Sequence, residues 1–227
     1  MDEFLSEKEQ IQYIHEWWQE NRSYILIFIL VVVGGITGNN AWKSNVAEKQ
    51  LSASSLYESL AEGVSDNNSE TAEEIADQIF NGYEDTIYFE KAKLAMAYFY
   101  MSQSRDEDAA NSLRDILQKS EDNEISLIAK YRLAKIMLYQ KKYQEVIDML
   151  IDNNGHAFET KYSELLGDAY YGLEKYDAAE ASYLTALRTT NQPQVVDAAL
   201  IQMKINDLPD LNDSIIIPED ETEITSQ

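Results

Sequence analysis

The hydrophobic positions of this 227-residue chain form two patterns that change near residue 43. Residues 23–42 form an uncharged run that is mostly aliphatic or aromatic. Further along, apolar residues recur at intervals of three and four, as at Leu56, Leu60 and Val64, which is the period of an amphipathic helix. Polar breaks separate these helices at residues 65–69, 81–85, 102–106, 120–124 and 153–155. The pattern therefore predicts an all-α chain in which one apolar helix precedes a series of amphipathic helices.

The uncharged run is long enough to cross a bilayer. About 20 helical residues span a hydrocarbon core of about 30 Å. Trp17 and Trp18 precede the run and Trp42 ends it, where indole rings favour the headgroup region. A cleaved signal peptide fits poorly, because the first 22 residues contain six acidic side chains and only two basic ones. A buried core helix is the remaining alternative to a membrane span.

Two further features of this run bear on packing and orientation. Gly34 and Gly38 form a Gly-x-x-x-Gly pair, a spacing that permits close packing of membrane helices but also occurs by chance. Basic residues near the ends of a span decide its orientation. Two of them, Lys8 and Arg22, precede the run, and two follow it at residues 43 and 49. Their number therefore does not indicate which side of the membrane the large domain faces.

The amphipathic helices also repeat, most clearly over residues 162–188. Here Gly167 is followed by Ala179, Tyr183 and Ala186, so small residues face a neighbouring helix at fixed intervals. This resembles a tetratricopeptide repeat, in which two antiparallel helices approach closely at small residues and aromatic side chains fill the remaining space.

Two weaker copies lie upstream, with Ala97 and Ala134 in the place of Gly167. The step from each of these residues to the next packing position, which is Ala109, Val146 or Ala179, is the same in all three copies. The steps between copies are close to the length of the ideal repeat, about 34 residues. A helix pair over residues 47–80 is expected to open the solenoid, and residues 195–208 are expected to close it. The residues predicted to pack between helices are Ala97, Ala134, Gly167, Ala179, Tyr183 and Ala186.

A curved stack of helix pairs exposes a concave face that the first helix of each pair lines. Aromatic and methionine side chains on such a face suit an extended peptide, although packing between helices is the alternative role for each tyrosine. The predicted groove has no run of Lys and Arg that would grip a peptide carboxylate. Its candidate residues are Tyr98, Met101, Tyr131, Lys135, Leu138, Tyr139 and Tyr171.

Charge and composition exclude several functions. The net charge is -23, and residues 43–208 alone carry 29 acidic and 16 basic side chains, so binding to nucleic acid is not expected. The acidity itself fits solubility, adaptation to salt or a basic partner surface. No cysteine occurs, which removes disulfides and thiolate chemistry. His15 and His156 stand in no catalytic or metal-binding motif. We therefore expect a protein that is not an enzyme and has no catalytic residues, cofactor or metal site.

Four segments follow from these observations. Residues 1–22 form a short N-terminal segment, residues 23–42 the membrane helix and residues 43–208 the repeat domain. Residues 209–227 form an acidic tail without a basic residue, which is expected to be disordered. Within it, the three isoleucines at residues 215–217 are either a short docking motif or a stray apolar run.

Several landmarks together resemble a known family. They are IQYIHEWWQEN at residues 11–21, the glycine-containing anchor followed by Trp42, the divergent repeats, and IQMKINDL at residues 201–208. This combination resembles the ancillary subunits of the SecYEG translocon, the YfgM family of Gram-negative inner membranes. The long acidic tail departs from that pattern, as does His15, where a basic residue is usual.

The resemblance implies a cytoplasmic N-terminus, one inner-membrane helix and a periplasmic repeat domain. It also implies association with the SecYEG translocon and with a membrane-anchored periplasmic chaperone of the peptidyl-prolyl isomerase type. Such a scaffold would help pass exported, unfolded polypeptides to chaperones. The alternative is a membrane-tethered repeat scaffold that faces the cytoplasm and organises a regulatory or structural assembly.

Overall fold

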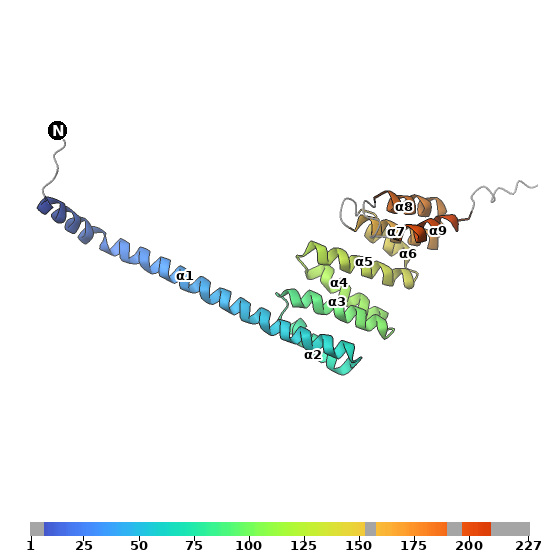
Figure 1. Cartoon of the computed structure of the whole chain (residues 1–227), viewed down its shortest axis with the longest axis horizontal. Coiled ribbons are helices and arrows are strands. Elements are labelled where there is room, and N and C mark those ends of the chain that lie inside the picture. The colour runs from blue at the N-terminus through green and yellow to red at the C-terminus, as the bar shows by residue number, and fades with distance from the viewer. Residues whose placement is uncertain (1–6, 153–157, 190–196, 210–227) are drawn as a thin grey trace, which may run out of the picture. The chain divides into compact units, whose positions relative to one another are not determined.

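The computed structural model describes residues 7–152, 158–189 and 197–209, and all regular structure within these ranges is helical (Figure 1). The helices are α1 (Glu7–Ser65), α2 (Ser69–Gly82), α3 (Ile87–Ser102), α4 (Asp106–Lys119), α5 (Asn123–Tyr139), α6 (Tyr143–Leu150), α7 (Glu159–Gly172), α8 (Tyr176–Thr189) and α9 (Ala198–Asn206). The predicted all-α fold, with one candidate membrane helix followed by a tetratricopeptide-like solenoid, is confirmed.

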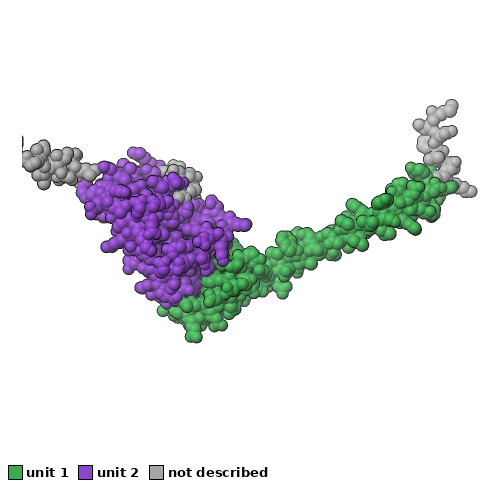
Figure 2. Space-filling model, turned by 180° about the vertical axis from the view of Figure 1, so that it is seen from behind, with its two compact units in different colours: residues 1–89 green, residues 90–227 purple. Residues whose placement is uncertain are grey.

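The chain divides into two compact units, residues 1–89 and residues 90–227 (Figure 2). The first contains α1, α2 and the start of α3, and the second contains the rest of α3 and helices α4 to α9. The predicted break at residues 153–155, His156 and the acidic tail beyond Pro209 lie outside the described residues.

α1 is a single helix of 59 residues, which corresponds to a length of about 88 Å. It has no break at either end of residues 23–42, so the predicted span and the first repeat helix are continuous. Among the described residues it is the one helix that is long and apolar enough to cross a membrane, and none of its apolar window is buried. Leu26, Phe28 and Leu30 are all exposed, so the alternative of a buried core helix is wrong.

The C-terminal part of α1 pairs with α2 in the same register as the later repeats. Leu60 and Ala72 are both fully buried, and the step between them equals the step within each of the other three copies. A Cβ atom on Gly63 would lie 3.3 Å from the backbone nitrogen of Ala72, so the two helices meet closely here. The sequence pattern alone did not assign this register, because Leu60 is larger than the glycine or alanine that the repeat favours.

Each of the first four helix pairs turns through a residue with left-handed backbone. These residues are Asn67, Ser104, Lys141 and Glu174, with φ between 55° and 59°. At Ser104, the backbone N–H donates to the carbonyl of Met101 and the next N–H donates to Tyr100. The other three turns repeat both bonds, which is the Schellman arrangement that satisfies the last carbonyls of a helix. This arrangement reverses the chain within a few residues.

The core of the second unit lies between successive helices of the stack. α5 packs against α4, α6 and α7, and α8 packs against α7 and α9. Ala97, Ala134 and Ala179 are buried at the helix contacts. Ile201 of α9 is fully buried in one cluster with Ala179, Tyr183 and Ala186, so α9 covers the last helix pair.

Gly167 lies at a very close contact between α7 and α8. A Cβ atom at this position would be 2.3 Å from Cε1 of Tyr183, so the tyrosine ring occupies the space that a side chain on α7 would need. The hydroxyl of Tyr183 then donates to Oδ1 of Asp168 at 2.8 Å. The aromatic ring on α8 therefore fills the space that the glycine leaves on α7.

The left-handed turns predict that Ser104→Gly stabilises the protein. A side chain in this conformation costs about 1–2 kcal/mol. Glycine adopts it without penalty, although its greater freedom in the unfolded chain offsets part of the gain. We expect the free energy of unfolding to rise by up to about 1 kcal/mol, measured by urea unfolding of the detergent-solubilised full chain. Ser182→Gly, inside α8, is the matched control and should be destabilising. A fall in stability for Ser104→Gly would contradict the strain argument.

The contact between Gly167 and Tyr183 predicts that Gly167→Ala is destabilising. The added methyl group overlaps the ring, and overpacking of a core costs about 1–3 kcal/mol. Gly82→Ala is the control, because a Cβ atom there meets nothing within 4 Å. Thermal unfolding followed by circular dichroism should show a lower midpoint for Gly167→Ala only. Equal midpoints for the two variants would place Gly167 away from a close helix contact.

Candidate functional site

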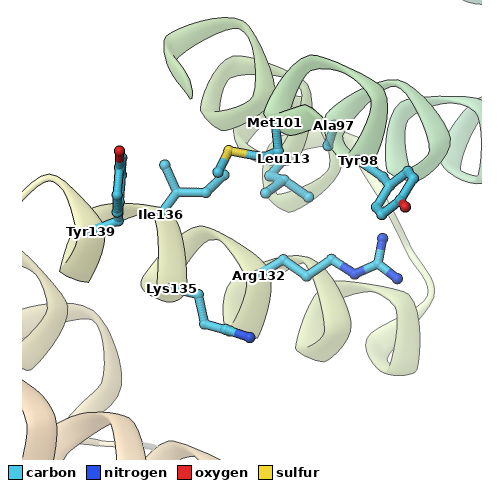
Figure 3. Close-up of a pocket in the computed structure, with 8 residues that line it drawn as sticks. All are labelled: Ala97, Tyr98, Met101, Leu113, Arg132, Lys135, Ile136 and Tyr139. Carbon is cyan, nitrogen blue, oxygen red and sulfur yellow. The ribbon is translucent and has the colours of Figure 1, made fainter. Parts of the chain in front are cut away.

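A cavity of about 450 Å³ lies between α3 and α5 (Figure 3). Its lining combines apolar, aromatic and basic side chains from three helices. The lining residues are Ala97, Tyr98, Met101, Leu113, Arg132, Lys135, Ile136 and Tyr139. All of them belong to the second compact unit.

Helical spacing explains why these side chains share one cavity. On α5, Arg132 is followed by Lys135, Ile136 and Tyr139, which are three, four and seven positions further on. Residues at these intervals lie on one side of a helix. α3 contributes Tyr98 and Met101, also three positions apart.

The floor and the rim of the cavity differ in character. Ala97, Leu113 and Ile136 are buried and form an apolar floor. Tyr98 and Tyr139 are 70% and 75% exposed, so their rings stand at the rim and cover little of the core. The cavity therefore offers an apolar surface bordered by two accessible aromatic rings.

Two basic residues also line the cavity, and only one of them, Lys135, was predicted from the sequence. Nη1 of Arg132 donates to the backbone carbonyl of Leu94 at 3.3 Å, which ties α5 to α3. Nζ of Lys135 lies 5.7 Å from the ring centroid of Tyr131. Neither cation forms an ion pair with a carboxylate of the described residues. Arg132 was not among the predicted groove residues, because its contribution requires the neighbouring helix.

The structure separates the seven predicted groove residues into different places. Tyr98, Met101, Lys135 and Tyr139 line the cavity. Of the other three, Leu138 packs against the core. Tyr131 also packs there, with its ring 6.0 Å from that of Phe158.

Tyr171, the last of the seven, lines a second cavity with Asp168, Tyr183, Lys204 and Asp207. Its ring lies 5.8 Å from that of Tyr176. The candidate face is therefore not one continuous tyrosine surface.

A cluster of charges between α7 and α9 dominates the second cavity. Nζ of Lys204 donates to Oε1 of Glu164 at 2.9 Å and to Oδ1 of Asp168 at 2.7 Å. Lys204 belongs to the IQMKINDL segment that carries part of the family resemblance. These bonds join the closing helix to the last repeat, so the segment has a structural role.

The cluster also changes the ionisation of its members. Burial by itself lowers the pKa of Lys204, but hydrogen bonds to Asp168 and Glu164 outweigh it, so the pKa is raised. Burial, followed by the charge and hydrogen bond of Asp168, raises the pKa of the Tyr183 phenol. Lys204 therefore stays charged and Tyr183 neutral over the physiological range.

Outside these two cavities the described residues show little that suggests chemistry. They contain no group of three or more His, Asp or Glu side chains placed to hold a metal ion. Gly34 and Gly38 of α1 have open space around them, so the face that they share is free in the single chain.

Comparison with known proteins connects these features to a family. The sequence model for the tetratricopeptide repeat-like domain matches residues 15–210. The chain is 24% identical to the ancillary SecYEG translocon subunit of Aggregatibacter actinomycetemcomitans, and the match covers 90% of this chain and 98% of that protein. The subunit of the same name from Haemophilus influenzae matches with the same identity and coverage. That from Escherichia coli is 22% identical over 92% of this chain and 99% of its own length. The search of solved structures gave no match.

The Lys204 cluster predicts a stability effect that depends on pH. Lys204→Gln leaves Glu164 and Asp168 without their cation, which should lower the free energy of unfolding by about 1–3 kcal/mol at pH 7. The pKa of Lys204 is raised in the folded state, so its contribution is complete below the unfolded value of about 10.4 and is lost as the pH rises through the folded value.

Urea unfolding of both proteins between pH 7 and pH 11 measures this difference. Lys175→Gln, at an exposed position, serves as the control and should show almost no effect at any pH. A difference between wild type and Lys204→Gln that is as large at pH 11 as at pH 7 would contradict the role of the charge.

Proposed function

Because the chain belongs to the tetratricopeptide repeat-like domain family, we propose that it is a non-enzymatic, membrane-anchored scaffold of a bacterial Sec translocon. The observation that carries this proposal is the similarity to ancillary SecYEG translocon subunits, which extends over nearly the whole length of both proteins. The matched region includes the apolar run as well as the repeats. Anchor and repeat domain therefore act together in the proposed function.

The proposed location is the inner membrane, which the chain crosses once through the apolar part of α1. Its N-terminus lies in the cytoplasm and its repeat domain in the periplasm. Ala53 is the first buried residue among the described side chains of α1. From Trp42, at the end of the uncharged run, to Ala53 the helix rises by only about 16 Å. This short and continuous connection supports a repeat domain held close to the membrane surface, where exported chains emerge.

In this position the cavity between α3 and α5 contacts unfolded segments of exported polypeptides. Tethering raises the effective concentration of such segments, so weak contacts are sufficient. The scaffold then helps transfer the exported chain to a membrane-anchored periplasmic chaperone of the peptidyl-prolyl isomerase type. The exposed rings of Tyr98 and Tyr139 support this role, because tyrosine offers a large rigid contact area at low entropic cost.

Labelling of single introduced cysteines tests the orientation. The native chain has no cysteine. Gln19→Cys therefore places a single thiol before the apolar run, and Ser59→Cys places a single thiol after it. A thiol reagent that crosses the outer but not the inner membrane should label Ser59→Cys in intact cells and leave Gln19→Cys unlabelled. The reverse result would favour a scaffold that faces the cytoplasm.

Crosslinking in cells tests the partners. We expect a photoreactive residue in the anchor, at Ile29, to crosslink to a SecYEG subunit, and one at Met101 to crosslink to exported chains. Tyr98→Ser with Tyr139→Ser should reduce the Met101 crosslinks several-fold, because the exposed rings at the rim are lost. Crosslinks from Ile29 should be unchanged.

Tyr171→Ser is the matched control, since Tyr171 lies outside this cavity, and melting curves verify that all variants fold. Equal Met101 crosslinks in wild type and the folded double variant would move polypeptide contact to another surface. Absence of SecYEG subunits among the Ile29 products would remove the proposed association through the anchor.

A further inference from the structure

We propose that the cavity between α3 and α5 selects extended polypeptide segments in which an acidic side chain lies close to a large apolar one. This inference rests on the proposed function and specifies its ligand. It follows from the combination of an apolar floor with two cations that the described part of the protein leaves without a carboxylate.

The size and floor of the cavity suit one or two apolar side chains. Its volume of about 450 Å³ lies in the lower part of the range of about 300–1,000 Å³ that is usual for ligand sites. Met101, Leu113 and Ile136 line it, and methionine adapts to side chains of different shape. Aliphatic and aromatic side chains of a ligand therefore both find a surface here.

Both cations line the cavity from α5, although in Figure 3 the end of the Lys135 side chain is directed away from α3. Arg132 and Lys135 are three positions apart, which places them next to each other on a helix surface. In Figure 3 the guanidinium of Arg132 lies opposite the ring of Tyr98, across the space between α3 and α5. The hydrogen bond to the Leu94 carbonyl uses only one of its five N–H donors. A carboxylate can accept two bonds from the remaining fork.

The charge of the surrounding protein makes this arrangement informative. With a net charge of -23, carboxylates are abundant, and several cations of the same unit pair with them. Lys93 pairs with Asp115 at 2.6 Å and Arg114 pairs with Glu107 at 2.9 Å. Arg132 and Lys135 have no such partner among the described residues. An acidic ligand group would therefore supply the missing charge.

The same positive charge disfavours basic segments at this cavity. The overall acidity attracts basic peptides at long range, but such attraction is not specific and falls with salt. At the cavity itself, Arg132 and Lys135 repel a ligand lysine. Preference for an acidic over a basic peptide is thus the opposite of what net charge alone would produce.

Peptide binding to the detergent-solubilised full chain tests the proposal. Three fluorescent peptides differ only in one position, which is Glu, Gln or Lys beside a Leu-Phe pair, and binding is followed by fluorescence anisotropy. We expect the Glu peptide to bind about tenfold more tightly than the Gln peptide, as one charge-assisted hydrogen bond provides, and the Lys peptide to bind most weakly. The preference for Glu should shrink with added salt.

The protein variants assign this preference to the two cations. Arg132→Gln with Lys135→Gln should abolish the difference in affinity between the Glu and Gln peptides. Lys175→Gln with Arg188→Gln makes the same change of net charge at exposed positions outside the cavity and should retain the difference. Lys135→Gln alone gives an intermediate result, and melting curves establish that each variant is folded.

Several outcomes would overturn the inference. They are equal binding of the Glu and Gln peptides, tightest binding of the Lys peptide, or a full preference for Glu in the Arg132 and Lys135 double variant. Truncation after Pro209 should leave all affinities unchanged; a clear gain would assign the cavity to the protein's own acidic tail. Crosslinking of the anchor to the translocon does not depend on the cavity. Absence of these crosslinks would therefore contradict the proposed function but not the peptide preference.

Discussion

Close approach of paired helices is the constraint on which the rest of this structure depends. At Gly167 there is no space for even a methyl group, because the ring of Tyr183 lies where a Cβ atom would be. Alanines at positions 97 and 134 lie buried in the same place of the earlier repeats. Small residues bring the helices together and larger ones pack around them, so each helix depends on its neighbours to bury its apolar side.

The turns obey a second constraint, which is that each reversal must be short and must satisfy the last helical carbonyls. Four Schellman turns achieve this with Asn, Ser, Lys and Glu in a left-handed conformation that favours glycine. Each turn follows the position of close helix approach at the same short interval. The strain at these residues persists because packing on both sides of the turn determines the path of the chain.

α1 combines two environments in one helix. None of its apolar window is buried. Exposure of these side chains would be unfavourable in water, whereas a bilayer requires an apolar surface on a spanning helix. Its last turns instead bury Ala53 and Leu60 in the first helix pair. Because the helix is continuous, the candidate membrane segment and the repeat register are mechanically linked.

The sequence by itself determined the helical class, the membrane-length helix and the constant spacing within each repeat, because these depend on periodicity along one chain. It also predicted a tyrosine-bearing face, since the register of the repeats identifies the first helix of each pair. Only the tertiary structure decided which of these side chains meet. Tyr98 and Tyr139 share a cavity, whereas Tyr131 packs on Phe158 and Tyr171 lies near Lys204.

Two basic residues show most clearly what depended on the tertiary structure. Arg132 lines the cavity and donates to the Leu94 carbonyl, and Lys204 links α7 to α9. The partners in these contacts are separated by 36 to 40 positions along the chain. Local spacing states which side of a helix a residue occupies, but the neighbour on that side is set by the packing of distant segments.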